Sequence, residues 1–164
     1  MPPALPTTPA LAIRRATADD VPALHALLQL YYTEGDVHVT EDEQSLHAAL
    51  NQRPYGFFLA ELGPTKEIAG CVLLRALDIS QAAECKRLFV LPQHRGHNIA
   101  ALLMDSLEDT ARASNLRYVY LDTKDNFQAA IRMYRRRGYT DTPRYNQNPQ
   151  ATLFLRKDLL SHEG

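Results

Sequence analysis

The sequence lacks the features that direct a protein to a membrane or to a polyanion. No apolar run approaches the roughly 20 residues needed to span a bilayer. The 18 Lys and Arg nearly balance the 19 Asp and Glu, and a formal net charge of -1 gives no overall field that attracts nucleic acid. We therefore expect no membrane segment and no nucleic-acid partner, and a local site must recognise any ligand.

Cysteine is scarce, and the two residues present are poorly placed for metal chemistry. Cys71 and Cys85 belong to no Cys-x-x-Cys pair and to no Cys/His cluster, so we expect no metal site. The sequence shows no secretory signal, which favours a reducing, cytoplasmic location. A single disulfide between the two thiols stays open as the alternative.

The remaining composition is that of one globular domain. The chain has 164 residues, of which 45% are apolar and 23% are charged, which suits a full hydrophobic core. Residues 1–10 hold four prolines and no charged side chain, and we interpret them as a flexible tail. Residues 11–164 are expected to form a single domain.

Hydrophobic periodicity predicts a mixture of helices and strands after the tail. A first helix follows Thr17 and ends at Gly35-Asp36, and a second follows Thr40–Glu43, which fits a capping box. The predicted order is β-α-α-β-β-β-α-β-α-β-β. This order indicates an α/β fold with one mixed sheet, antiparallel early and parallel where a helix joins two strands. The expected strands begin near residues 13, 57, 68, 84, 118, 139 and 151, and the two later helices near residues 97 and 126.

The segment from Pro92 to Ala100, between a predicted strand and a predicted helix, suits a phosphate. A helix N-terminus offers unpaired N–H groups and a partial positive charge, and Gly96 lets the backbone approach an anion. A plain strand-to-helix loop with a glycine turn explains these residues equally well. The segment is neither a P-loop nor a dinucleotide fingerprint, because the required Gly-Lys-Ser/Thr and two of the three glycines are missing.

Two segments nevertheless resemble the signatures of the GNAT (Gcn5-related N-acetyltransferase) superfamily. Lys86–Ala100 is similar to its acetyl-CoA motif, a strand followed by Arg/Gln-x-x-Gly-x-Gly/Ala and a helix, with Arg95 first and Ala100 last. Asn98 stands where the family usually has glycine, and Asn tolerates left-handed backbone better than most residues. Residues 126–139 resemble the second signature, Asn-x-x-Ala-x-x-x-Tyr-x-x-x-Gly-Phe/Tyr.

The resemblance implies a fold, a reaction and a co-substrate. The fold is a central mixed sheet of six to seven strands flanked by about four helices. The reaction is transfer of an acetyl group from acetyl-CoA, without a metal, to a primary amine of a small molecule or amino acid, by direct attack in a ternary complex. A protein or peptide acceptor and a non-catalytic acyl-CoA-binding module are the alternatives, and a homodimer is left open.

The same resemblance assigns residues to the co-substrate. The main chain of Leu88, Phe89 and Val90 is expected to bind pantetheine as an added strand does. Asn126 is expected to contact the pantetheine arm, with a helix N-cap as the alternative. The run at residues 135–137 either binds a CoA phosphate or is a solvated helix end. The expected phosphate loop consists of Arg95, Gly96, His97, Asn98, Ile99 and Ala100.

Two side chains are the predicted catalytic groups. Glu84 is expected to act as a general base through a water, and a solvent-facing strand-end carboxylate is the alternative. Tyr134 is expected to protonate the leaving CoA thiolate, and a core tyrosine is the alternative, although an apolar ring with a polar tip suits both.

The acceptor is expected to lie between the end of the first helix and a late loop. Tyr31, Tyr32 and Glu34 are predicted to line it, with Glu34 attracting a cation. Across from them, Tyr145 and Asn146 belong to a loop that resembles a Tyr-Asn-x-x-Pro subgroup of bacterial GNAT proteins of unsettled substrate. These loop residues could instead satisfy only their own backbone.

Overall fold

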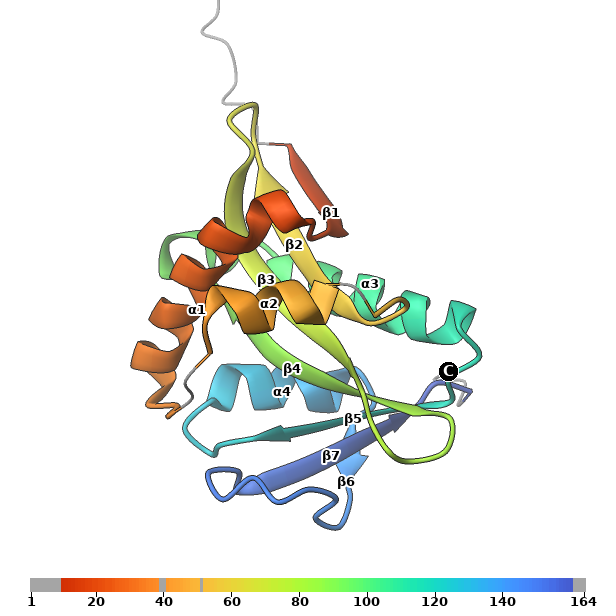
Figure 1. Ribbon diagram of the computed structural model, residues 1–164. Helices are drawn as coiled ribbons and strands as arrows, with labels where there is room; N and C mark the ends of the chain where they lie inside the picture. The colour runs from red at the N-terminus through yellow and green to blue at the C-terminus, as the bar shows by residue number, and fades with distance from the viewer. Residues whose placement is uncertain (1–9, 39–40, 51, 161–164) are drawn as a thin grey trace, which may run out of the picture.

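A seven-stranded mixed sheet forms the centre of the computed structural model, which describes residues 10–38, 41–50 and 52–160 (Figure 1). Its strand order is β1-β2-β3-β4-β5-β7-β6. Only β4 and β5 pair in parallel, as the crossover helix between them predicts. The predicted mixed sheet is therefore confirmed. The strands are β1 (Leu11–Arg15), β2 (Gly56–Leu62), β3 (Glu67–Ala76), β4 (Ala82–Val90), β5 (Tyr118–Thr123), β6 (Thr140–Asp141) and β7 (Leu153–Asp158).

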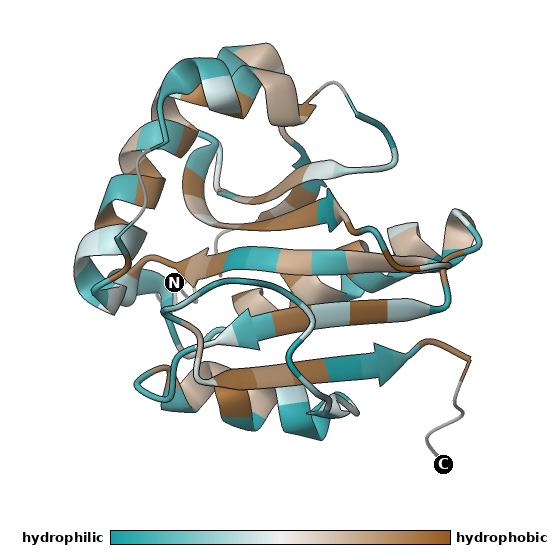
Figure 2. Ribbon diagram, turned by 60° about the horizontal axis from the view of Figure 1, so that its bottom comes forward, coloured by the Kyte–Doolittle hydropathy of each residue, from teal (hydrophilic) through white to brown (hydrophobic). Residues whose placement is uncertain are grey.

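Four α-helices cover the two faces of the sheet. Helices α1 (Val21–Gly35) and α2 (Glu43–Leu50) pack on one face, while α3 (Ile99–Ala113) and α4 (Gln128–Arg136) pack on the other (Figure 1). Successive side chains of β2 point to opposite faces of the sheet, so each face has its own core. Leu59 joins the core under α1, and Phe58 joins the core under α3. Each helix carries both hydrophobic and hydrophilic residues, as amphipathic helices on a sheet must (Figure 2).

Side-chain caps set where the first two helices begin. Thr17 and Asp20 bond reciprocally around a short 3-10 turn, η1 (Ala18–Asp20), with the Thr17 N–H 2.7 Å from Asp20 Oδ2. For α2 the cap is Asp42, whose Oδ1 accepts the Ser45 N–H at 2.9 Å. The predicted capping box begins at Thr40, which lies outside the described residues.

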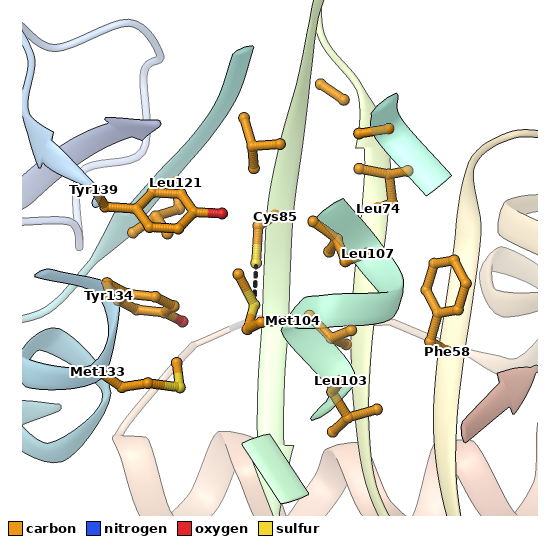
Figure 3. Close-up of a cluster of buried hydrophobic side chains, with 14 of the residues drawn as sticks. Phe58, Leu74, Cys85, Leu103, Met104, Leu107, Leu121, Met133, Tyr134 and Tyr139 are labelled. Atoms are coloured by element: carbon orange, nitrogen blue, oxygen red, sulfur yellow. Dashed lines mark hydrogen bonds between the residues drawn. The ribbon is translucent and has the colours of Figure 1, made fainter. Parts of the chain in front are cut away.

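The largest core lies between the sheet and helix α3. Figure 3 shows Met104 of α3 against Cys85 of β4, with the Cys85 Sγ 3.7 Å from the Met104 Sδ, and Leu103 and Leu107 of the same helix toward Leu74 and Phe58. Each such buried aliphatic side chain contributes roughly 1.5–3 kcal/mol. Cys71 and Cys85 are both buried free thiols, so the disulfide left open by the sequence is not formed.

A bulge in β4 opens the sheet. Residues Ala82–Glu84 pair with Tyr118–Tyr120, and no further β4–β5 pairs follow although both strands are described in full. The register of β4 against β3 shifts beyond Lys86, where Arg87 adopts a left-handed φ of 56°. A bulge of this kind bends a strand and re-aims its side chains. The backbone of residues 88–90 is thereby left without a strand partner on its β5 side.

Two general features of the described residues complete the fold. None of their helices is long and apolar enough to cross a membrane. They also contain no group of three or more His, Cys, Asp or Glu side chains that could hold a metal ion. Of the predicted tail, only Ala10 is described, and its carbonyl accepts the Gly63 N–H at 2.8 Å.

Candidate active site

Two adjoining cavities lie where β4 and β5 separate. The larger, about 720 Å³, borders the loop between β4 and α3, and we call it the loop cavity. The smaller, about 410 Å³, lies on the side of β5 and the loop at residues 142–152, and we call it the basic cavity. Leu88, Phe127 and Ala130 line both cavities, so the two spaces meet at these side chains.

Left-handed backbone shapes the rim of the loop cavity. Gly96 has a φ of 86°, and Asn98 has a φ of 64° and a ψ of 18°. Asn98 thus adopts the left-handed backbone that asparagine tolerates better than most residues, and it is the N-cap of α3. The first N–H groups of α3, beginning with that of Ile99, lack intrahelical partners, so this rim can bind an anion.

Most of the residues predicted for the co-substrate line the loop cavity. His97 does not, because it is exposed and its Nδ1 lies 3.2 Å from the His94 carbonyl. Asn126 does line it and donates to the Gly35 carbonyl at 3.4 Å, whereas Phe127 takes the N-cap position of α4. The other predicted residues that line it are Leu88, Phe89, Val90, Arg95, Gly96, Asn98, Ile99 and Ala100, joined by His94, Ala101, Met133, Arg136 and Arg137.

Arg95 is fixed at the edge of the loop cavity by three contacts. Its Nη2 lies 2.6 Å from Glu34 Oε1, its Nε donates to the Val90 carbonyl at 2.9 Å, and its guanidinium stacks 5.5 Å from the Phe89 ring centroid. Glu34 therefore lines the loop cavity and is not found on the acceptor side, where it was predicted. The sequence placed it on the correct helix end but could not show that Arg95 reaches it.

The basic cavity contains three of the residues predicted for the acceptor and several cations. Tyr31, Tyr32 and Asn146 line it, whereas Tyr145 does not. The charged residues of this cavity were not predicted from the sequence. Asp122 could have been, because it stands near the carboxyl end of a predicted strand, where ligands of parallel sheets bind. The missed charged residues are Arg75, Lys86, Arg87, Asp122 and Lys124.

Glu84 lies beneath this cavity, held by donors from this chain. Its side chain is 1% exposed, which rules out the solvent-facing alternative. Arg75 Nη2 donates to Oε1 at 2.9 Å, while the Tyr145 hydroxyl and Asn146 Nδ2 donate to Oε2 at 2.7 and 3.2 Å. Lys86 Nζ is 3.5 Å from the same Oε2. The carboxylate is thus oriented by three hydrogen bonds and a neighbouring ammonium.

Asp122 forms a second buried carboxylate beside Glu84. It accepts from Lys86 Nζ at 2.6 Å, Asn146 Nδ2 at 2.6 Å and Asn148 Nδ2 at 3.2 Å. Burial opposes its ionisation, but the Lys86 ammonium and the two amides outweigh burial and hold the pKa of Asp122 below its ordinary value. Asn146 therefore bridges the two carboxylates and ties the late loop to the sheet.

The late loop also satisfies its own backbone. Asn146 Oδ1 accepts the Asn148 N–H, and Asn148 Oδ1 accepts the Gln150 N–H, both at 3.1 Å. The Tyr145 ring packs on Tyr120, with centroids 5.0 Å apart. The amide oxygens of these loop residues therefore satisfy the turn, as one alternative predicted, while the amide nitrogens reach the sheet.

Tyr134 projects from α4 toward β4. It lines the basic cavity, is 6% exposed, and its hydroxyl points from α4 toward β4 (Figure 3). Among the described residues this hydroxyl has no hydrogen-bond partner. Burial raises its pKa well above the ordinary value, since a phenolate would lose its hydration. Tyr134 therefore remains protonated and has a donor to spare.

Gln150, which lines the basic cavity, joins the late loop to the segment after α1. Its Oε1 accepts the His38 N–H at 2.9 Å and its Nε2 donates to the His38 carbonyl at 3.0 Å. Lys124 supports the same loop, with its Nζ 3.2 and 2.7 Å from the carbonyls of Gly35 and Asp36. We call the Gln150–His38 pair the clasp.

Comparisons with known proteins agree with this architecture. Residues 21–139 match the model of the acetyltransferase (GNAT) family. An IAA acetyltransferase of Azospirillum brasilense is 30% identical over 129 residues, covering 76% of this chain and 82% of the relative. A GNAT-family acetyltransferase of Staphylococcus aureus superposes with a TM-score of 0.81 at 21% identity, covering 92% of this chain and 99% of that one. The PaiA N-acetyltransferase of Thermoplasma acidophilum, solved with coenzyme A, superposes with a TM-score of 0.74 at 13% identity, covering 91% of this chain and 99% of that one. The chain therefore belongs to the GNAT family of acyl-CoA-dependent N-acetyltransferases.

Proposed function

We propose that the protein acetylates the primary amine of a small molecule, with acetyl-CoA in the loop cavity and the acceptor in the basic cavity. The clasp carries this proposal. Gln150 and His38 connect the loops on either side of the basic cavity, and a peptide chain crossing the site would have to part them. A small amine fits within about 410 Å³ without doing so.

The residues of the loop cavity suit acetyl-CoA. The left-handed turns at Gly96 and Asn98 present the start of α3 to a pyrophosphate. The backbone edge of residues 88–90 has no β5 strand partner and suits the amide groups of a pantetheine arm. Arg136 lies at the same cavity, and no described residue pairs with it, so it is available to a further phosphate. When bound, acetyl-CoA supplies an activated thioester carbonyl.

Tyr134 is the proposed donor to the leaving sulfur. Its hydroxyl keeps its proton because of burial, and it lines the basic cavity beside the residues that the two cavities share. A hydrogen bond from a protonated phenol stabilises negative charge as it develops on a sulfur. Its raised pKa makes complete proton transfer less favourable, so the donated hydrogen bond is its main contribution.

Glu84 is better suited to a positioning role than to the base role expected from the family. Its two oxygens already accept from Arg75, Tyr145 and Asn146, so a water would have to displace one of these donors. We propose that Glu84 holds the late loop against the sheet. Cations around the acceptor favour the neutral amine, which lessens the need for a strong base.

An acceptor screen tests the proposed function. Release of the CoA thiol from acetyl-CoA is measured with small primary amines, amino acids and peptides. Turnover of a small acceptor and none of peptides is expected. Turnover of peptides alone would reassign the protein as a peptide N-acetyltransferase. Tight acetyl-CoA binding without turnover of any acceptor would instead indicate a sensor.

A further inference from the structure

We infer that the acceptor carries a carboxylate near its amine and that Arg87 binds this carboxylate, which makes a compact amino acid the acceptor class. The inference rests on the proposed acetyl transfer and deepens it. Its basis is the distribution of charge around the basic cavity together with the conformation of Arg87.

Positive charge predominates in the lining of the basic cavity. Four cationic side chains line it, namely Arg75, Lys86, Arg87 and Lys124, against one carboxylate, Asp122. A cavity with this lining attracts an anionic group and repels additional ammonium groups. A polyamine, whose second ammonium would have to enter the same field, is disfavoured.

The cations differ in how far acidic partners neutralise them. Lys86 lies between Asp122, at 2.6 Å, and Glu84, at 3.5 Å. Arg75 pairs with Glu84, and half of its side chain is exposed. Lys124 contacts two backbone carbonyls and no described carboxylate. Lys86 is therefore the most compensated, and the cavity keeps positive charge that its own acids do not balance.

Arg87 presents an unoccupied guanidinium edge to the cavity. Its Nε lies 3.2 Å from Glu41 Oε2 and donates to the Tyr32 hydroxyl at 3.1 Å, which fixes the side chain. Neither of its Nη nitrogens has a hydrogen-bond partner among the described residues. Every fully buried side-chain nitrogen in that part of the chain has a partner, so the two Nη nitrogens are not fully buried. Both Nη nitrogens are therefore accessible, although the side chain is only 13% exposed.

Such an edge fits a carboxylate. Two N–H groups of a guanidinium in one plane match the two oxygens of a carboxylate, and Arg is suited to this geometry. The bulge places the edge here, since Arg87 adopts a left-handed φ of 56° within β4. A β-bulge commonly re-aims one side chain at a site.

The position of Arg87 also limits the size of the acceptor. Its chain neighbour Leu88 lines both cavities, so the carboxylate site lies beside the point where acceptor and acetyl-CoA meet. The amine and the carboxylate of the acceptor must then be close together, as they are in an α-amino acid. The surrounding cations favour the neutral amine of such a molecule, which is the form that reacts.

Matched acceptors test the inference in the unmodified protein. Thiol release is measured for the proteinogenic L-amino acids and for their carboxamides, which keep the amine and lose the charge, and for spermidine. We expect kcat/KM for the favoured amino acid to exceed that of its carboxamide by about tenfold or more, the effect of one charge-assisted group. Equal or faster turnover of the carboxamide or of spermidine would overturn the inference while leaving the acetyltransferase function intact.

Variants of Arg87 locate the carboxylate. Arg87→Gln is expected to raise KM for the amino acid about tenfold or more and to leave the carboxamide nearly unchanged, whereas Arg87→Lys recovers part of the loss. Arg132→Gln, on the exposed face of α4, is the matched control. Acetyl-CoA binding and thermal unfolding are measured for each variant, and Arg87→Lys decides if Arg87→Gln does not fold. An equal loss for both acceptors would exclude Arg87 as the carboxylate site.

Discussion

Gln150 and His38 lie 112 positions apart in the chain and are joined by two hydrogen bonds. The pairing resembles one rung of a sheet, because a side-chain amide takes the place of a backbone peptide group. It holds the segment after α1 against the late loop, and the proposed function requires that it close the acceptor site to long chains.

Removing the clasp should loosen acceptor binding. We expect Gln150→Ala to raise KM for the small acceptor several-fold, because the two loops no longer hold its cavity closed, with a smaller change in the affinity for acetyl-CoA. Steady-state kinetics and acetyl-CoA titration measure the two effects. Gln52→Ala, at an exposed glutamine distant in sequence from both loops, is the control. An unchanged KM would show that the clasp does not close the site.

The Tyr134 hydroxyl should act in the chemical step. Tyr134→Phe keeps the ring packed against Tyr139 and removes only the donor. We expect kcat to fall by about 100-fold, the usual effect of losing one hydrogen-bond donor to a developing negative charge, with acetyl-CoA affinity nearly unchanged. Rapid-mixing assays of thiol release separate chemistry from product release. A parent-like rate of the chemical step would eliminate Tyr134 as the donor.

Glu84→Gln distinguishes a positioning residue from a general base. The substitution removes the charge of a buried carboxylate that pairs with the half-exposed Arg75, and it weakens the attachment of Tyr145 and Asn146. We expect a loss of about 1–3 kcal/mol in the free energy of unfolding, the cost of weakening hydrogen bonds to a charged group. A lower kcat with an unchanged pH–rate profile is expected from a positioning residue. A rate loss concentrated at low pH would instead restore the predicted base.

Asn98 should tolerate glycine and reject branched residues. Its φ of 64° is open to glycine, whereas a β-branched side chain is strained there. Asn98→Val is expected to lower the free energy of unfolding by about 1–3 kcal/mol and to weaken acetyl-CoA binding. Asn98→Gly is expected to preserve both. Chemical denaturation and calorimetric titration of acetyl-CoA provide the two measurements, and a stable, tightly binding Asn98→Val would contradict the proposed loop.

The sequence predicted those parts of the site that depend on local backbone. The strand-to-helix loop and the start of a helix just after Gly96 depend on residues within a few positions of each other, and the structure has both, with α3 beginning at Ile99. The side-chain partners were not predictable in the same way. Arg87 enters the cavity only because β4 shifts its register at a bulge, which an alternating pattern does not reveal. Glu34 meets Arg95, and Gln150 meets His38, only once the chain has folded.

Asp20 should make the stability of the fold depend on pH in the acid range. The Arg14 guanidinium donates two hydrogen bonds to this carboxylate, at 2.8 Å each, and despite partial burial it lowers the pKa of Asp20 from 3.8 to about 2. A carboxyl whose folded pKa is lowered contributes stability above its unfolded pKa and loses it as pH falls toward the folded value. The contribution of Asp20 is therefore fully present above about pH 5 and disappears between about pH 4 and pH 2.

Unfolding of Asp20→Asn at several pH values tests this contribution. We expect the variant to be about 1–2 kcal/mol less stable than the parent at pH 7 and the difference to shrink as the pH approaches 2. Asp19→Asn, at the exposed neighbouring carboxylate, controls for the loss of one negative charge in the same turn. A difference that stays constant down to pH 2 would show that the Arg14–Asp20 pair is not its source, because only an ionised Asp20 can accept both bonds from Arg14.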